Sequence, residues 1–145
     1  MTAELLRESY HIQGRNFDKA GEISSEIKVI LKDLELDASC VRRVVIVSFE
    51  AEMNVVMYAD RGTLTLILTD RDITLEVRDE GPGIPDIDQA MKEGYSTASD
   101  EMREMGFGFG MGLPNMKKNS DEFCIESEVG KGTSVFARIR LDSHG

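Results

Sequence analysis

Four glycines alternate with bulky side chains between residues 106 and 112, a segment that reads GFGFGMG. Glycine loses more conformational freedom on ordering than any other residue, so a fold seldom keeps such a run unless the backbone must approach something closely. The run leads into a helix-compatible stretch over residues 113–118, and successive backbone N–H groups at a helix start can bind phosphates. The known phosphate-loop patterns GxxxxGK[ST] and GxGxxG do not match this chain.

Two further clusters carry side chains suited to binding or catalysis. Glu50 and Asn54 are four residues apart, so a helix would hold them one turn apart on the same face. Asp79 ends an alternating apolar segment and is followed by Glu-Gly-Pro-Gly-Ile, a turn whose glycines let the backbone approach a ligand. Each cluster alone has a simpler interpretation, Glu50 as a surface acid and the second cluster as the end of a hairpin.

The apolar periodicity predicts an α+β order of elements. Helices are expected over residues 17–36, 87–93 and 113–118, and strands over residues 8–12, 63–69, 73–79, 123–127 and 133–139. Residues 40–59 are ambiguous, because the β-branched first half favours a strand and the second half favours a helix. Residues 94–105 are expected to form a mobile loop. Antiparallel strand pairs with helices before and between them predict a sandwich with helices on one face of a sheet.

Length and charge restrict the class of protein. With 145 residues, the chain is expected to form one domain over residues 1–145. Its net charge of −10, from 17 basic and 27 acidic side chains, argues against nucleic acid as a partner. The first residues lack the features of a signal peptide and no segment reaches the length of a membrane span, so a cytoplasmic location is expected. Cys40 and Cys124 are too far apart for a CxxC metal site, and both thiols are expected to be buried.

Taken in this order, the three clusters resemble the N, G1 and G2 boxes of the GHKL ATPases, the superfamily of gyrase, the Hsp90 chaperones, histidine kinases and MutL. The boxes correspond to Glu-x-x-x-Asn at residues 50–54, Asp-x-Gly-x-Gly at residues 79–83 and the glycine run at residues 106–112. The resemblance implies a two-layer α/β sandwich whose sheet is mixed but mostly antiparallel, with helices on one face. It also assigns residues 40–59 to a helix, because the family holds its Glu and Asn on one.

The resemblance implies ATP and Mg²⁺ as ligands and gives roles to individual residues. Glu50 would be the general base, Asn54 would coordinate Mg²⁺, and Asp79 would accept a hydrogen bond from the adenine amino group. The other ATP-binding positions would be Gly81, Gly83, Ile84, Leu113 and Thr133, together with the phosphate-wrapping glycines Gly106, Gly108, Gly110 and Gly112. Arg103 is a candidate contact for the γ-phosphate, and residues 96–105 would form a lid that closes on ATP.

Within the superfamily, the chain is similar to the small branch of anti-sigma factors and serine protein kinases, and above all to the switch kinases of the bacterial stressosome pathway. The segments that carry this similarity are residues 58–62 and, especially, residues 79–87 with residues 94–97. The branch implies a serine/threonine kinase that acts on a STAS-domain antagonist protein. The resemblance leaves open whether a further partner is a sigma factor or a phosphatase, and whether the chain forms a homodimer. The alternatives are a nucleotide-dependent module that sequesters a partner without phosphorylating it, and a sensor-kinase-like ATPase.

Overall fold

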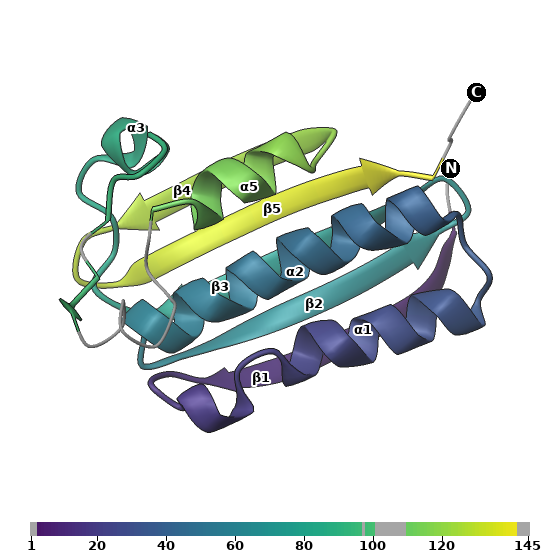
Figure 1. The fold of residues 1–145 in the computed structure, drawn as a ribbon, viewed down its shortest axis with the longest axis horizontal. Coiled ribbons are helices and arrows are strands. Elements are labelled where there is room, and N and C mark those ends of the chain that lie inside the picture. The colour runs from purple at the N-terminus through teal and green to yellow at the C-terminus, as the bar shows by residue number, and fades with distance from the viewer. Residues whose placement is uncertain (1–2, 97, 101–109, 142–145) are drawn as a thin grey trace.

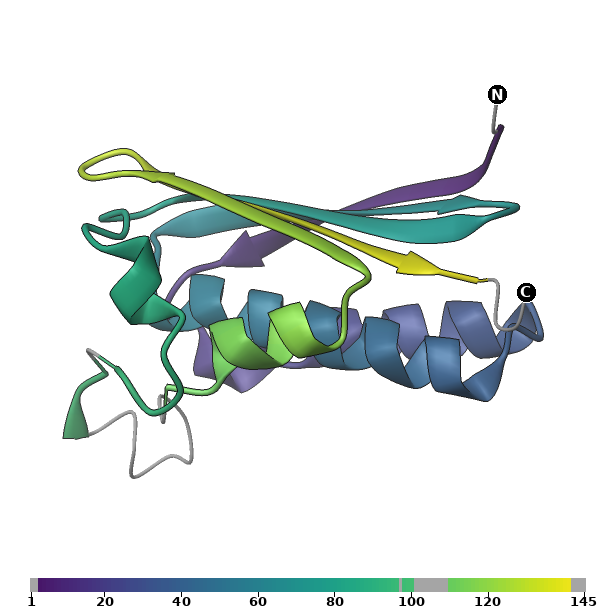
Figure 2. The ribbon, with the colours of Figure 1, turned by 90° about the horizontal axis from the view of Figure 1, so that it is seen from above.

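The computed structural model describes residues 3–96, 98–100 and 110–141. They form two layers, in which helices cover one face of a five-stranded sheet (Figure 1, Figure 2). The strands lie in the order β1-β2-β3-β5-β4, and all four pairings among them are antiparallel. The elements are β1 (Glu4–Gln13), η1 (Phe17–Lys19), α1 (Glu22–Asp33), α2 (Ala38–Tyr58), β2 (Arg61–Thr69), β3 (Asp72–Glu80), α3 (Ile87–Ala90), α5 (Gly112–Lys118), β4 (Glu122–Glu128) and β5 (Gly132–Arg140). The predicted fold class is confirmed, with a sheet that is antiparallel in every described pairing rather than mixed.

The long helix α2 lies between α1 and α5 in the helical layer (Figure 1). Its start is capped by Asp37, whose carboxylate accepts hydrogen bonds from the backbone N–H groups of Ser39 and Cys40 at 3.1 and 3.2 Å. Val44, Val47, Ala51 and Val55 recur every three or four residues and are all buried in the core. Burial of this stripe outweighs the strand preference of the β-branched residues, so the expected helix over residues 40–59 is confirmed.

The hairpin of β2 and β3 forms the centre of the sheet. Leu64 and Leu66 on β2 pair with Val77 and Leu75 on β3, and all four side chains are buried. The alternation predicted from the sequence therefore brings one apolar face of the sheet against the helices. The second predicted hairpin is present as β4 and β5, paired around the turn before Gly132.

Several predicted element boundaries differ from the structure. The strand expected at residues 8–12 is longer, because β1 pairs with β2 from Glu4 to Gln13. The single helix expected over residues 17–36 is divided into η1 and α1, because Gly21 between them has a left-handed φ of 92°. The helix expected over residues 87–93 ends at Ala90. Residues 97 and 101–105 of the expected mobile loop lie outside the described residues.

The two cysteines differ in exposure. Cys40 is buried, as expected, whereas Cys124 is exposed. The expectation for Cys124 was wrong because its side chain alternates with those of Phe123 and Ile125 along the edge strand β4 and takes the outer position. Over the described ranges, no helix has both the length and the apolar character needed to cross a membrane.

A buried carboxylate joins α1 to α2. Glu52 on α2 is 2% exposed and accepts hydrogen bonds from the backbone N–H groups of Gly21, Ile23 and Ser24, at 3.0, 3.4 and 3.2 Å. N–H groups at the start of a helix have no partner within the helix, and Glu52 supplies one for them. Burial raises the pKa of Glu52, while these N–H donors oppose the rise.

We expect Glu52→Gln to lower the free energy of unfolding by about 1–3 kcal/mol, because an amide nitrogen cannot accept from an N–H group and leaves a donor of α1 unpaired. Since folding raises the pKa of Glu52, the folded wild type loses stability as the pH rises from about 4.3 through the pKa of the folded state. The difference between the two proteins should therefore be larger at about pH 5 than at about pH 8, as measured by urea unfolding.

The matched control for this measurement is Glu22→Gln, in the exposed first turn of α1. It should change the free energy of unfolding by less than about 0.5 kcal/mol at both pH values. Equal effects of the two substitutions would contradict the role given to Glu52.

Candidate functional site

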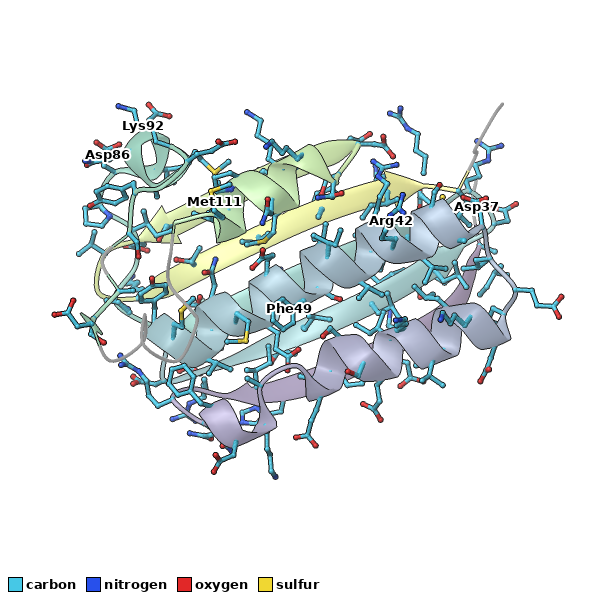
Figure 3. All side chains as sticks on the ribbon, viewed as in Figure 1. Asp37, Arg42, Phe49, Asp86, Lys92 and Met111 are labelled. Carbon is cyan, nitrogen blue, oxygen red and sulfur yellow. The ribbon has the colours of Figure 1, made fainter. Side chains whose placement is uncertain are left out.

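A cavity of about 540 Å³ opens between α2, the segment that follows β3, and the start of α5. This volume is within the range of small-molecule sites. Phe49, Asp86 and Met111, labelled in Figure 3, belong to three of its walls: α2, the segment before α3, and the residue before α5. The sequence-predicted residues that line it are Glu50, Asn54, Asp79, Gly83, Ile84, Gly110, Gly112, Leu113 and Thr133.

The wall formed by α2 presents Glu50 and Asn54, both partly buried and one helical turn apart. Both side chains face the first residue of α5, because a Cβ built on Gly112 would lie 3.4 Å from Asn54 Oδ1 and 3.8 Å from Glu50 Oε1. The second oxygen of the carboxylate, Glu50 Oε2, accepts a hydrogen bond of 2.8 Å from Asn115 Nδ2. A carboxylate and an amide oxygen thus converge on one point beside a residue without a side chain.

Asp79 lies near the end of β3, with its side chain in the cavity wall. Its Oδ1 accepts a hydrogen bond of 3.0 Å from the backbone N–H of Thr133 on β5. Burial raises the pKa of Asp79, and the Thr133 N–H opposes the rise. Gly81 does not line the cavity, but a Cβ there would lie 3.3 Å from Asp79 Oδ1.

The loop after β3 is fixed to the turn between β4 and β5. The backbone N–H of Ile84 donates to Ser127 Oγ at 2.7 Å, and Ser127 Oγ also bonds Thr133 Oγ1 at 2.8 Å. Gly83 has a φ of 78°, and a Cβ on it would collide with the carbonyl of Glu128. Gly83 is therefore required by contact with the chain's own backbone, and Ser127 connects Ile84 to Thr133.

Two glycines of the run at residues 106–112 are described. Gly110 has a φ of 79°, and its carbonyl accepts a hydrogen bond of 3.0 Å from the N–H of Gly94. A Cβ on Gly110 would collide with the backbone of Gly94 and Tyr95, whereas Gly112 faces the two α2 side chains. Arg103, Gly106 and Gly108 lie outside the described residues, as does most of the predicted lid over residues 96–105.

The described cavity lining is acidic. It contains Glu50, Asp79 and Asp86, and none of its described members is lysine or arginine. No cluster of three or more His, Cys, Asp or Glu side chains suited to a metal ion occurs in the described part of the chain. A site with so few oxygen donors from the protein fits Mg²⁺, because Mg²⁺ is usually bound by one or two protein oxygens together with the phosphates of a substrate.

Two functional candidates, Asn115 and Ser127, were missed by sequence reasoning. Asn115 lies within α5 and Ser127 within an edge strand, where neither residue type gives a local signal. Asn115 is one helical turn after Gly112, and Ser127 pairs with Thr133 across the hairpin. Each could be found only from its position relative to a motif residue in the folded chain.

The sequence matches a family model described as histidine kinase-, DNA gyrase B-, and HSP90-like ATPase over residues 39–143. It is 36% identical to the serine/threonine-protein kinase RsbT of Bacillus subtilis over 92 residues, and this matched region covers 61% of this chain and 63% of that protein. It is also 36% identical over 97 residues to the anti-sigma F factor of Clostridium acetobutylicum, which covers 63% of this chain and 64% of that protein. The chain thus matches less than two thirds of the length of either relative.

Two solved structures share the fold at low sequence identity. One is the SiaB-SiaC complex from Pseudomonas aeruginosa, with a TM-score of 0.61 and 14% identity over 94% of this chain and 91% of that chain. The other contains the RsbU and RsbW domains of a Mycobacterium tuberculosis protein, with a TM-score of 0.57 and 16% identity over 92% of this chain and 32% of that chain.

The close packing of Gly83 can be tested against Gly130, which has a similar φ of 84° but nothing within 4 Å of a built Cβ. We expect Gly130→Ala to lower the free energy of unfolding by about 1 kcal/mol, from backbone strain alone. Gly83→Ala should lower it by at least about 1 kcal/mol more, because the added methyl displaces the backbone at Glu128. Urea unfolding of the two variants measures this difference, and equal losses would show that the close contact carries no energy.

Proposed function

The chain belongs to the histidine kinase-, DNA gyrase B- and HSP90-like ATPase family, and we propose that it is an ATP-dependent protein serine/threonine kinase. Its proposed substrate is a STAS-domain antagonist protein in a partner-switching pathway. The observation that carries the proposal is the convergence of Glu50 and Asn54 on Gly112 within one cavity. A proton acceptor and a cation ligand then face the same part of a bound nucleotide.

In this proposal, the adenine ring lies beside Asp79. Because Oδ1 of this carboxylate already accepts from the Thr133 N–H, Oδ2 is left to accept a hydrogen bond from the adenine amino group. Guanine has a carbonyl at that position, so the carboxylate selects adenine. Gly83 and Ile84 would line the base, and Thr133, held through Ser127, would reach it through water.

The phosphates would extend toward Asn54, Gly110 and Gly112. A bound Mg²⁺ would supply positive charge that neutralises the phosphates. Asn54 Oδ1 is the proposed ligand from this chain. The absence of lysine and arginine from the described cavity lining supports a divalent cation as the main counter-charge.

Glu50 is the proposed general base. The hydroxyl oxygen of the substrate serine or threonine attacks the γ-phosphorus, the bond to the bridging oxygen breaks, and ADP leaves with the bridging oxygen. The hydroxyl proton passes to Glu50, whose Oε1 faces the cavity beside Gly112.

The relatives support a regulatory protein as substrate, since one is named as a serine/threonine-protein kinase and another as an anti-sigma F factor. The anti-sigma relative also supports a second candidate function, in which the chain sequesters a partner in a nucleotide-dependent way without phosphorylating it. The two candidates differ in one measurable quantity, the covalent mass of the partner after exposure to Mg²⁺ and ATP.

In the first experiment, the protein that co-purifies with this chain is captured, and its intact mass is measured by mass spectrometry before and after addition of Mg²⁺ and ATP. We expect a gain of one phosphate with the wild type and none with Glu50→Gln, because the amide cannot accept the hydroxyl proton. The affinity of Glu50→Gln for ATP should stay within about threefold of the wild type, since the base acts only in the transition state.

Glu52→Gln, two residues away and directed toward α1, is a control for general damage to α2. It should retain transfer under conditions where it is folded. A partner whose mass never changes, in a complex that tightens or loosens with nucleotide, would contradict the kinase proposal and favour sequestration.

Asp79→Asn tests the adenine contact. We expect its affinity for ATP to fall by about 10- to 100-fold and its affinity for ITP to fall less, because the new amide can donate to the carbonyl of hypoxanthine. Because burial raises the pKa of Asp79, the wild type should lose affinity as the pH falls, beginning above the range of an exposed aspartate. Calorimetric titration of both proteins over pH measures this, and parallel pH curves would contradict the assignment.

A further inference from the structure

The two oxygens of the Glu50 carboxylate have different surroundings. Oε2 accepts the 2.8 Å hydrogen bond from Asn115 Nδ2, so it is tied to α5. Oε1 faces Gly112, beside Asn54 Oδ1. One oxygen is therefore held by a neutral donor while the other is directed toward the cavity.

We propose that Asn115 is a positioning residue, which fixes the Glu50 carboxylate so that Oε1 is directed at the acceptor hydroxyl. The inference rests on the proposed function, in which Glu50 is the general base. A glutamate side chain has several staggered rotamers, and a base works only within hydrogen-bond reach of the proton that it takes. A donor on Oε2 removes this freedom before the reaction, so less ordering remains to be done in the transition state.

Asn115 is suited to this role because its own position is fixed. Its backbone N–H donates to the Met111 carbonyl at 2.8 Å, and its carbonyl accepts from Asn119 Nδ2 at 2.9 Å. Its neighbours Pro114 and Met116 are buried, and Met116 belongs to the core. Rotation of α5 would expose these side chains, so the amide of Asn115 is held on the side of α5 that faces α2.

The chemical nature of the donor also fits. An amide donates a hydrogen bond without bringing a positive charge to the carboxylate, so Glu50 is oriented without forming an ion pair. Among the described residues that line the cavity, none is a lysine or arginine that could take over this contact. Loss of the Asn115 amide would therefore leave Oε2 without its only described hydrogen-bond donor.

The test uses ATP hydrolysis by the full chain with Mg²⁺, where water replaces the protein hydroxyl as acceptor. We expect Asn115→Leu, which keeps the size of the side chain but removes the donor, to lower kcat by about 10- to 100-fold. The KM for ATP should stay within about twofold, because the contact orients the base rather than the nucleotide. Asn115→Asp, which has the same shape and no donor when ionised, should lower kcat at least as much and decides the test if Asn115→Leu does not fold.

The matched control is Lys117→Ala, which changes an exposed side chain of the same helix that does not line the cavity. It should leave kcat within about twofold of the wild type. An equal loss of kcat in Lys117→Ala and Asn115→Leu would mean that both act through the integrity of α5, and it would overturn the proposal.

A double-mutant cycle with Glu50→Gln separates positioning from general structural support. If Asn115 acts through Glu50, Asn115→Leu should lower kcat in the wild type and cause no further loss in Glu50→Gln. If Asn115→Leu lowers kcat by the same factor in the wild type and in Glu50→Gln, the proposal is overturned. It is also overturned if the kcat of the wild type is no higher than that of Glu50→Gln. Hydrolysis that depends on both residues, with no partner protein ever phosphorylated, would support the positioning role while rejecting the kinase proposal.

Discussion

Burial of one stripe of α2 against the sheet is the interaction on which the rest of the structure depends. Because successive helical residues are rotated by about 100°, Ala51 faces the sheet, Glu50 faces α5 and Glu52 faces α1. The flanking helices lie on opposite sides of α2 (Figure 1), and each is tied to it by one of these carboxylates. The packing that builds the core therefore also sets the direction in which the proposed base points.

The glycines of the site contribute in two different ways. Gly83 and Gly110 have positive φ and touch the chain's own backbone, at Glu128 and at Gly94 respectively. Gly112 instead leaves room beside Glu50 and Asn54. Close backbone approach is thus present at Gly83 and Gly110, where the approaching partner is the protein itself, whereas close approach of the backbone to a ligand stays a prediction. These contacts shape the cavity before any ligand enters it.

Local patterns and motifs in the sequence were sufficient to predict the helices and strands that hold the site, but not the side-chain contacts between them. Alternation was sufficient for the hairpin of β2 and β3, whereas residues 40–59 needed the Glu50 and Asn54 motif, because the propensity of the β-branched half favours a strand. The hydrogen bond from Asn115 to Glu50 joins residues 65 positions apart, and Glu52 reaches N–H groups about 30 positions earlier. Such contacts depend on how the helices pack against one another, and the periodicity of the sequence does not predict them.

Charge decides how an acidic chain can bind an anion. With a net charge of −10 and an acidic described lining, the field of the protein opposes the approach of a bare nucleotide. In the proposed function, Asp79 accepts the hydrogen bond from adenine and Glu50 accepts the proton of the substrate hydroxyl, so both acids stand near the nucleotide. A cation that arrives with the phosphates would offset this negative charge, and its proposed ligand from the chain is the neutral amide of Asn54. The acidity of the described lining is thus consistent with the proposed binding of ATP together with Mg²⁺.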